Sequence, residues 1–291
     1  MKVTELYSSL EGKRPLVAAD VSPPRSADAG SLVEAVQGIG ADLYCVAYSP
    51  GRAVRLGSVA AAVLLERWTA TPVIFNLATR DMNKLAIQMH LLEAQALGLQ
   101  NVLVLRGDAF TDRDIGLVQT VQDYTPTDLV KAIGEMNEGR DFRGSPLSRP
   151  TDLCAGAAIE FGRLLQAEVA LTHRKAQAGA QFFVVQSVFG GDAVREFGQR
   201  YTEMAGKPLA GPVLFGVQVF IKGGVKFGNT PEGICADLER GRSGIEIAVE
   251  TASQLWESGA RAFYIIAPIM KGGARDYDAA AQALAEIRRL G

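Results

Sequence analysis

Short apolar segments recur about every 30 residues along this chain, and a helical segment follows each of them. Eight of these segments are expected to be β-strands: Leu16–Val21, Leu43–Tyr48, Pro72–Ala78, Asn101–Gly107, Leu153–Ala158, Phe182–Val188, Pro212–Val219 and Ala262–Ile269. Continuous apolar runs are typical of parallel strands that are covered on both faces. The pattern therefore predicts a parallel α/β protein.

Eight strand–helix units favour a closed (β/α)8 TIM barrel, with residues 1–291 as a single domain. Two connections are longer than the others, Asp108 to Thr151 and Phe220 to Gly244, so insertions are expected after the fourth and seventh strands. A doubly wound open sheet is the alternative. Such a sheet usually carries a glycine-rich phosphate turn after its first strand, whereas Ser22–Arg25 here is Ser-Pro-Pro-Arg. The clearest helices are expected at Asn83–Leu97, Leu164–Ala178, Ala193–Met204, Ile245–Glu257 and Ala279–Leu290.

Composition narrows the class of protein further. The net charge is −2, so nothing predicts a nucleic-acid partner. Apolar runs are shorter than a membrane span, and the N-terminal segment lacks the apolar core of a secretion signal. Cys45, Cys154 and Cys235 are odd in number and widely spaced, which favours reduced thiols in a cytoplasmic protein. His90 and His173 fall in helical stretches, so we expect no metal centre.

Charged residues follow the strand at Asn101–Gly107 where parallel strands usually face their ligand. Arg106, Gly107 and Asp108 come directly after the apolar run, and the glycine would allow a ligand to approach the backbone closely. They are therefore a candidate binding segment. The alternative is a salt bridge between Arg106 and Asp108, because alternate residues of a strand point to the same side.

Three further side chains are candidates, and each has a plain structural alternative. Asp20 follows an apolar run, so it either faces a cleft as a general acid or caps the turn before Pro23. Gln186 offers a donor and an acceptor to a heterocycle edge, or else forms a hydrogen bond in the core. Lys175 belongs to a basic helix end that is either solvated or within reach of a phosphate.

Three segments resemble the methylenetetrahydrofolate reductase family. They are VAADVSPPR (Val17–Arg25), TRDMNKLAIQMHLLEAQALGLQNVLVLRGD (Thr79–Asp108) and RKAQAGAQFFVVQSVF (Arg174–Phe189). The resemblance implies a βα barrel that holds FAD at the carboxyl ends of its strands. It also implies that NADH or NADPH reduces the flavin, which then reduces 5,10-methylenetetrahydrofolate to 5-methyltetrahydrofolate.

The resemblance also implies roles for individual residues. Asp20 takes the place of the family's catalytic glutamate, which supplies a proton at folate N10. Asp108 matches the aspartate that lies near both flavin and pterin, so it is a candidate for catalysis, for substrate binding and for cofactor binding. Gln186 matches the glutamine that binds the folate. Aspartate in place of glutamate shortens the acid by one methylene group.

The expected flavin contacts are Arg106, Gly107 and Lys175, together with two positions at which this chain departs from the family. Ala47 stands where many members have threonine, and Asn76 stands where they have histidine. Two alternatives therefore stay open: a flavin-independent, pterin-binding barrel in one-carbon transfer, or a non-catalytic subunit of a methyl-transfer complex. We expect a folate as the small-molecule partner, no membrane, self-association, and a partner protein from one-carbon metabolism.

Overall fold

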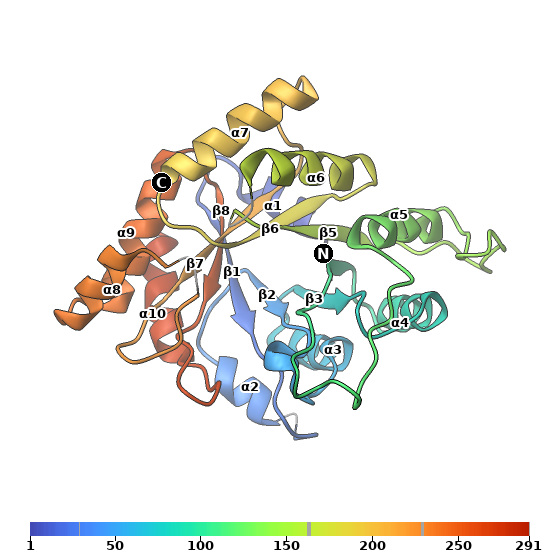
Figure 1. The fold of residues 1–291 in the computed structure, drawn as a ribbon, viewed down its shortest axis with the longest axis horizontal. Coiled ribbons are helices and arrows are strands. Elements are labelled where there is room, and N and C mark those ends of the chain that lie inside the picture. The colour runs from blue at the N-terminus through green and yellow to red at the C-terminus, as the bar shows by residue number, and fades with distance from the viewer. Residues whose placement is uncertain (29, 162–163, 228–229, 291) are drawn as a thin grey trace.

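The computed structural model describes residues 1–28, 30–161, 164–227 and 230–290. Eight parallel strands form a closed barrel in chain order, and β1 pairs with β8 to close it (Figure 1). The (β/α)8 barrel is therefore confirmed, and the open sheet is excluded. The strands are β1 (Leu16–Val21), β2 (Leu43–Val46), β3 (Val73–Ala78), β4 (Asn101–Leu105), β5 (Cys154–Ile159), β6 (Phe182–Ser187), β7 (Val213–Gln218) and β8 (Ala262–Ile266).

Several strands end earlier than the apolar pattern predicts. The expected ends at Tyr48, Gly107 and Ile269 were too late, because the chain has already left the barrel wall at these positions. At β4 the last paired residue is Leu105, opposite Ala78 of β3. Gly107 then takes a φ of +85°, which a regular strand does not allow. Arg106–Asp108 therefore belongs to the loop after β4.

The helices surround the strands, and the longer connections carry extra structure (Figure 1). Residues 106–153 include α5 and a loop that extends away from the barrel, and residues 219–261 include both α8 and α9. No helix in the described ranges is long and apolar enough to cross a bilayer. The helices are α1 (Val3–Leu10), α2 (Gly30–Val36), α3 (Ser58–Thr69), α4 (Lys84–Ala96), α5 (Pro126–Asn137), α6 (Leu165–Gln177), α7 (Gly191–Ala205), α8 (Glu232–Glu239), α9 (Gly244–Glu257) and α10 (Tyr277–Ile287), with a 3-10 turn at Pro50–Arg52.

Apolar side chains form one core between the sheet and the helices and another inside the barrel. The inner core depends on matching a large residue with a small one on adjacent strands. The ring of Phe182 occupies the space beside Gly156, where an added Cβ would lie 2.2 Å from the ring Cζ. Cys45 and Cys154 are buried in the inner core as free thiols, and Cys235 is a partly buried free thiol.

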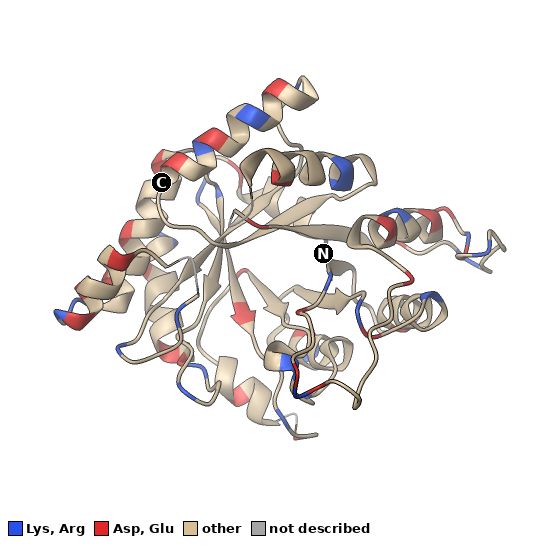
Figure 2. Cartoon of the chain, in the orientation of Figure 1, with Lys and Arg blue, Asp and Glu red and all other residues tan. Residues whose placement is uncertain are grey.

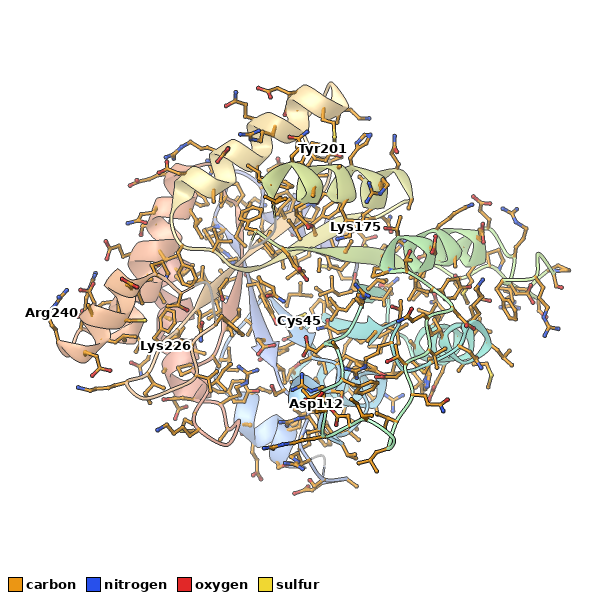
Figure 3. The ribbon with its side chains drawn as sticks, in the orientation of Figure 1. Cys45, Asp112, Lys175, Tyr201, Lys226 and Arg240 are labelled. Carbon is orange, nitrogen blue, oxygen red and sulfur yellow. The ribbon has the colours of Figure 1, made fainter. Side chains whose placement is uncertain are left out.

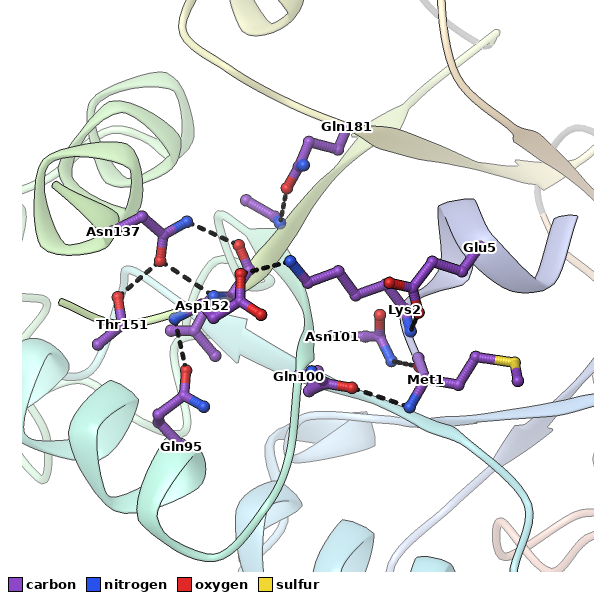
Figure 4. Close-up of polar contacts among 12 residues, drawn as sticks. Met1, Lys2, Glu5, Gln95, Gln100, Asn101, Asn137, Thr151, Asp152 and Gln181 are labelled. Carbon is purple, nitrogen blue, oxygen red and sulfur yellow. Dashed lines mark hydrogen bonds and ion pairs between the residues drawn. The ribbon is translucent and has the colours of Figure 1, made fainter. Parts of the chain in front are cut away.

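Helix α1 packs against the inner core at the N-terminal end of the barrel, and Figure 4 shows the polar contacts that tie the first residues of the chain to this end. The buried Asn101 amide accepts a hydrogen bond from the Val3 N–H at 2.8 Å and donates to the Met1 and Val73 carbonyls at 3.1 and 3.3 Å. An ion pair between Lys2 and Asp152 adds a further link. Because α1 occupies this end, the candidate site residues at the carboxyl ends of the strands lie at the opposite end.

Candidate functional site

Asp20 lies near the carboxyl end of β1, and its side chain is almost completely buried. Figure 2 shows red, the colour of Asp and Glu, on the arrow of β1 inside the ring of helices. The Tyr264 hydroxyl donates a hydrogen bond to Oδ1 of Asp20 at 2.6 Å, and Nη2 of Arg275 lies 3.1 Å from Oδ2. Each oxygen therefore has its own donor, as burial of a carboxylate requires. Sequence reasoning found Asp20 and missed both partners.

Arg275 also ties the loop after β8 to the residues that follow β1. Its Nε donates to Ser22 Oγ at 3.1 Å, and its Nη1 donates to the Ala267 carbonyl at 3.4 Å. Nearby, the Ser22 backbone N–H donates to the Tyr277 hydroxyl oxygen at 2.9 Å. The Arg275 side chain is 11% exposed. The guanidinium is thus held by Asp20 and by both loops.

Weakly acidic groups that stay protonated surround Asp20. Burial, followed by the charge of Asp20, raises the pKa of Tyr264 well above its ordinary value and that of Tyr277 to about 12. The same causes raise the pKa of the Cys45 thiol, which donates to Asn76 Oδ1 at 3.3 Å. The two phenols and the thiol are therefore neutral at physiological pH, and the charged partner of Asp20 is Arg275.

Asn76 and Ala47, two of the positions expected to contact a flavin, lie on β3 and directly after β2. The Asn76 side chain is buried and accepts the hydrogen bond from Cys45, while its backbone carbonyl accepts one from Ser58 Oγ at 2.7 Å. Ala47 follows β2, is half-buried and donates its backbone N–H to the Val21 carbonyl at 2.9 Å. Ala47 adjoins the end of β1, and Asn76 lies one strand further round the barrel. The Asn76 amide oxygen is already engaged by the protein itself.

The segment after β4 is open to solvent. Arg106 and Asp108 are both exposed, and no ion pair joins them in the described part of the chain. The alternative in which they form a salt bridge is therefore wrong. A Cβ at Gly107 would lie 3.2 Å from the Cβ atoms of both Ala78 and Arg80, so glycine is needed for the close packing of this turn as well as for its positive φ.

Arg80 holds this segment in place, and sequence reasoning missed it. Its side chain is 7% exposed and lies over the Phe110 ring, 4.2 Å from the centroid. Nη1 donates to the Asp108 carbonyl at 2.5 Å, and Nη2 donates to Asp81 at 2.8 Å. A signal was available, because Arg80 and Asp81 follow the apolar strand β3 as Arg106 and Asp108 follow β4.

Gln186 is exposed, at the point where β6 and β7 shift register between Val185 and Ser187. The side chain is therefore accessible at the end of β6, where a ligand at this end of the barrel could contact it. The expected alternative, a hydrogen bond in the core, does not apply to an exposed side chain.

Lys175 belongs to the last turn of α6, and its buried side chain lies between this helix and the strands (Figure 3). Its ammonium donates to the Ala158 carbonyl at 2.5 Å and lies 3.7 Å from the buried carboxylate of Glu168. A solvated helix end is therefore wrong for this residue. Contact with a phosphate would require these internal interactions to be replaced.

The family profile described as methylenetetrahydrofolate reductase matches residues 5–223. This chain belongs to that family. The match takes in Asp20, Arg106–Asp108 and Gln186, and it ends before Tyr264 and Arg275. No curated protein matches the sequence. The matched segment thus carries Asp20 but not the two side chains that bind it.

Solved structures show the same fold at low sequence identity. A protein from Clostridium thermocellum that binds two copies of 5-methyl-5,6,7,8-tetrahydrofolic acid is 12% identical, with a TM-score of 0.67 over 99% of this chain and 98% of that one. A 2,3-dimethylmalate lyase of the PEP mutase/isocitrate lyase superfamily is 16% identical, with a TM-score of 0.52 over 90% of this chain and 78% of the lyase. At these identities the comparisons establish the barrel alone.

Proposed function

We propose that this member of the methylenetetrahydrofolate reductase family binds a reduced folate at the carboxyl ends of its strands and acts on the one-carbon unit of that folate. The observation that carries the proposal is the buried Asp20 carboxylate at that end of the barrel, held by Tyr264 and Arg275. The family match and the folate-binding protein of the same fold support this class of ligand.

Gln186 and Asp20 suit two different parts of a reduced folate. The pterin edge presents N–H donors beside a carbonyl acceptor, and the Gln186 amide offers an acceptor and a donor to it. Opening of the five-membered ring of methylenetetrahydrofolate needs a proton at N10. We assign delivery of this proton to Asp20, whose carboxylate would first take a proton from solvent and then pass it to N10, since a positioned carboxyl group is the usual acid for such a step.

The finer proposal is reduction of 5,10-methylenetetrahydrofolate to 5-methyltetrahydrofolate with FAD and NADH or NADPH. A flavin could contact the segment after β4, because the side chains of Arg106 and Asp108 are exposed there and Gly107 has no side chain to cover its backbone. When bound, FAD would accept a hydride from the nicotinamide and pass it to the folate. Lys175 adds little to this fit, because its ammonium is already bound by Ala158 and lies against Glu168.

The second candidate is a folate-binding barrel that works without flavin in one-carbon transfer. The internal contacts of Lys175 and Asn76 favour it, because two of the expected flavin contacts are used by the protein itself. A non-catalytic subunit would show folate binding with no turnover. Measurements of folate binding, flavin binding and turnover separate these candidates.

The primary test is titration of the purified protein with 5-methyltetrahydrofolate, followed by calorimetry. We expect binding that Asp20→Asn weakens by at least tenfold, since a charge-assisted hydrogen bond contributes about 1.5–3 kcal/mol. The matched control is Asp152→Asn, which changes an exposed carboxylate near the opposite end of the barrel. Absence of binding by the wild-type protein would contradict the proposal.

The cofactor is tested by the visible spectrum of the protein after incubation with FAD, and by oxidation of NADH and NADPH with methylenetetrahydrofolate. FAD-dependent turnover would support the finer proposal. Turnover that is equal with and without FAD would support the flavin-independent candidate. If turnover depends on FAD, we expect Arg106→Ala to weaken flavin retention.

A further inference from the structure

The groups that bind Asp20 come from the far end of the sequence. Tyr264 belongs to β8, and Arg275 lies in the loop between β8 and α10. Both are outside residues 5–223, the segment that matches the family. Nothing in that match assigns them a role, although they form the closest polar contacts of the buried carboxylate.

The geometry leaves the carboxylate little freedom. Tyr264 and Arg275 engage different oxygens, at 2.6 and 3.1 Å, so rotation of the carboxyl plane would break at least one contact. The backbone of Asp20 is fixed as well, because β1 pairs with β2 on one side and with β8 on the other. An aspartate has one methylene group, so its carboxylate has only a short reach from this backbone.

The two partners are themselves fixed. Arg275 is bound by Ser22 and Ala267 in addition to Asp20. Burial keeps the Tyr264 phenol protonated, so it remains a hydrogen-bond donor at physiological pH. A fixed donor on each oxygen is what a site needs to hold a reacting group in one orientation.

We propose that Arg275 and Tyr264 are positioning residues that orient the Asp20 carboxylate toward the folate. This inference rests on the proposed function. Arg275 acts through Asp20, so its replacement should change kcat little once the Asp20 carboxylate has been removed. Replacement of a residue that merely stabilised the loop after β8 would lower kcat by the same factor with and without that carboxylate.

The test is a double-mutant cycle on turnover of methylenetetrahydrofolate, with folate affinity measured in parallel. We expect Arg275→Met to lower kcat about 100-fold, the scale of a misplacement of about 1 Å, with a smaller change in KM. Arg275→Lys keeps the charge and should recover part of the loss. In the Asp20→Asn background, Arg275→Met should lower kcat less than threefold further. Tyr264→Phe should follow the same pattern with a smaller loss.

The matched control is Arg14→Met, which removes a part-buried ion pair with Asp42 at the N-terminal end of the barrel. It should leave kcat unchanged. Losses that multiply in the double variants, or an Arg275→Lys protein no better than Arg275→Met, would overturn the inference while leaving the proposed function intact. A wild-type protein that neither binds nor converts folate would overturn both.

Discussion

A single carboxylate organises the polar contacts at the carboxyl end of β1. Asp20 is surrounded by groups from β8 and from the loop that follows it, and its charge contributes to the raised pKa of Tyr264 and Cys45. A buried charge of this kind is stable only while its partners are present. Changes at this residue should therefore alter chemistry and stability together.

We predict that Asp20→Asn lowers the rate of the folate step by about 10²–10⁴, because an amide cannot donate a carboxylic proton. Reduction of an artificial acceptor by the nicotinamide should be nearly unchanged. Asp20→Glu should also lose activity, since the added methylene pushes the carboxylate into Tyr264 and Arg275. Stopped-flow measurement of each half-reaction checks this. A wild-type folate rate in Asp20→Asn would place the acid elsewhere.

Tyr277 gives a prediction for alkaline pH. Its pKa is about 12 in the folded protein, because of burial and then of Asp20, against about 10 for an ordinary tyrosine. Its contribution to stability is complete below pH 10 and is lost as the pH rises from 10 to 12, because the unfolded chain ionises first. The full loss is about 3 kcal/mol.

Urea unfolding at several pH values between 9 and 12 checks the effect of Tyr277. The free energy of unfolding should fall less steeply with pH in Tyr277→Phe than in the wild-type protein. This difference in slope is expected even if the two proteins differ in stability at neutral pH. Equal slopes for the two proteins would show that this phenol does not carry the effect.

At the scale of single elements, β5 and β6 fit together because one strand supplies a large side chain and the other supplies none. The Phe182 ring leaves no room for a Cβ at position 156. We predict that Gly156→Ala lowers the free energy of unfolding by about 1–3 kcal/mol through overpacking. Phe182→Leu should recover part of this loss in the double variant.

The control for this pair is Gly198→Ala in α7, where an added Cβ meets nothing within 4 Å. There the substitution should raise stability by about 0.5–1 kcal/mol, since alanine favours the helix. Urea midpoints of the four variants provide the measurement. Strictly additive effects of Gly156→Ala and Phe182→Leu would contradict the packing argument.

At the scale of the whole molecule, the closed barrel has two ends, one that carries the candidate site and one that contributes to stability. Pairing of β1 with β8 brings the start of the chain beside its last strand, and this pairing assembles the Asp20 site. The opposite end is covered by α1, through the hydrogen bonds of Asn101. Stability and ligand binding should therefore respond separately to changes at the two ends.

We predict that Asn101→Ala lowers the free energy of unfolding by about 1–3 kcal/mol, because it leaves buried backbone groups of Val3 and Val73 without their partner. The affinity for 5-methyltetrahydrofolate should stay unchanged, since Asn101 begins β4 at the end away from Asp20. Urea unfolding and calorimetry check the two parts. A large loss of folate affinity would show that the two ends are coupled.

The sequence by itself determined the barrel and the positions of its strands. Each apolar run and each helix depends mainly on neighbouring residues, so a local pattern is enough to place eight strand–helix units. The same pattern placed Asp20 at the end of β1 and Gln186 at the end of β6, but it put Arg106 and Gly107 inside the fourth strand instead of in the loop after it. Strand ends were less accurate, because the chain leaves the wall where pairing stops, as at Leu105.

Only the tertiary structure decided which side chains meet. Tyr264 lies 244 residues from Asp20 in the sequence, and closure of the barrel alone brings them together. The same holds for Arg80, whose partner Asp108 lies on the next loop, and for Lys175, which is buried against β5 rather than solvated. Hydrogen bonds and ion pairs depend on distances set by the whole fold, and a local pattern does not contain those distances.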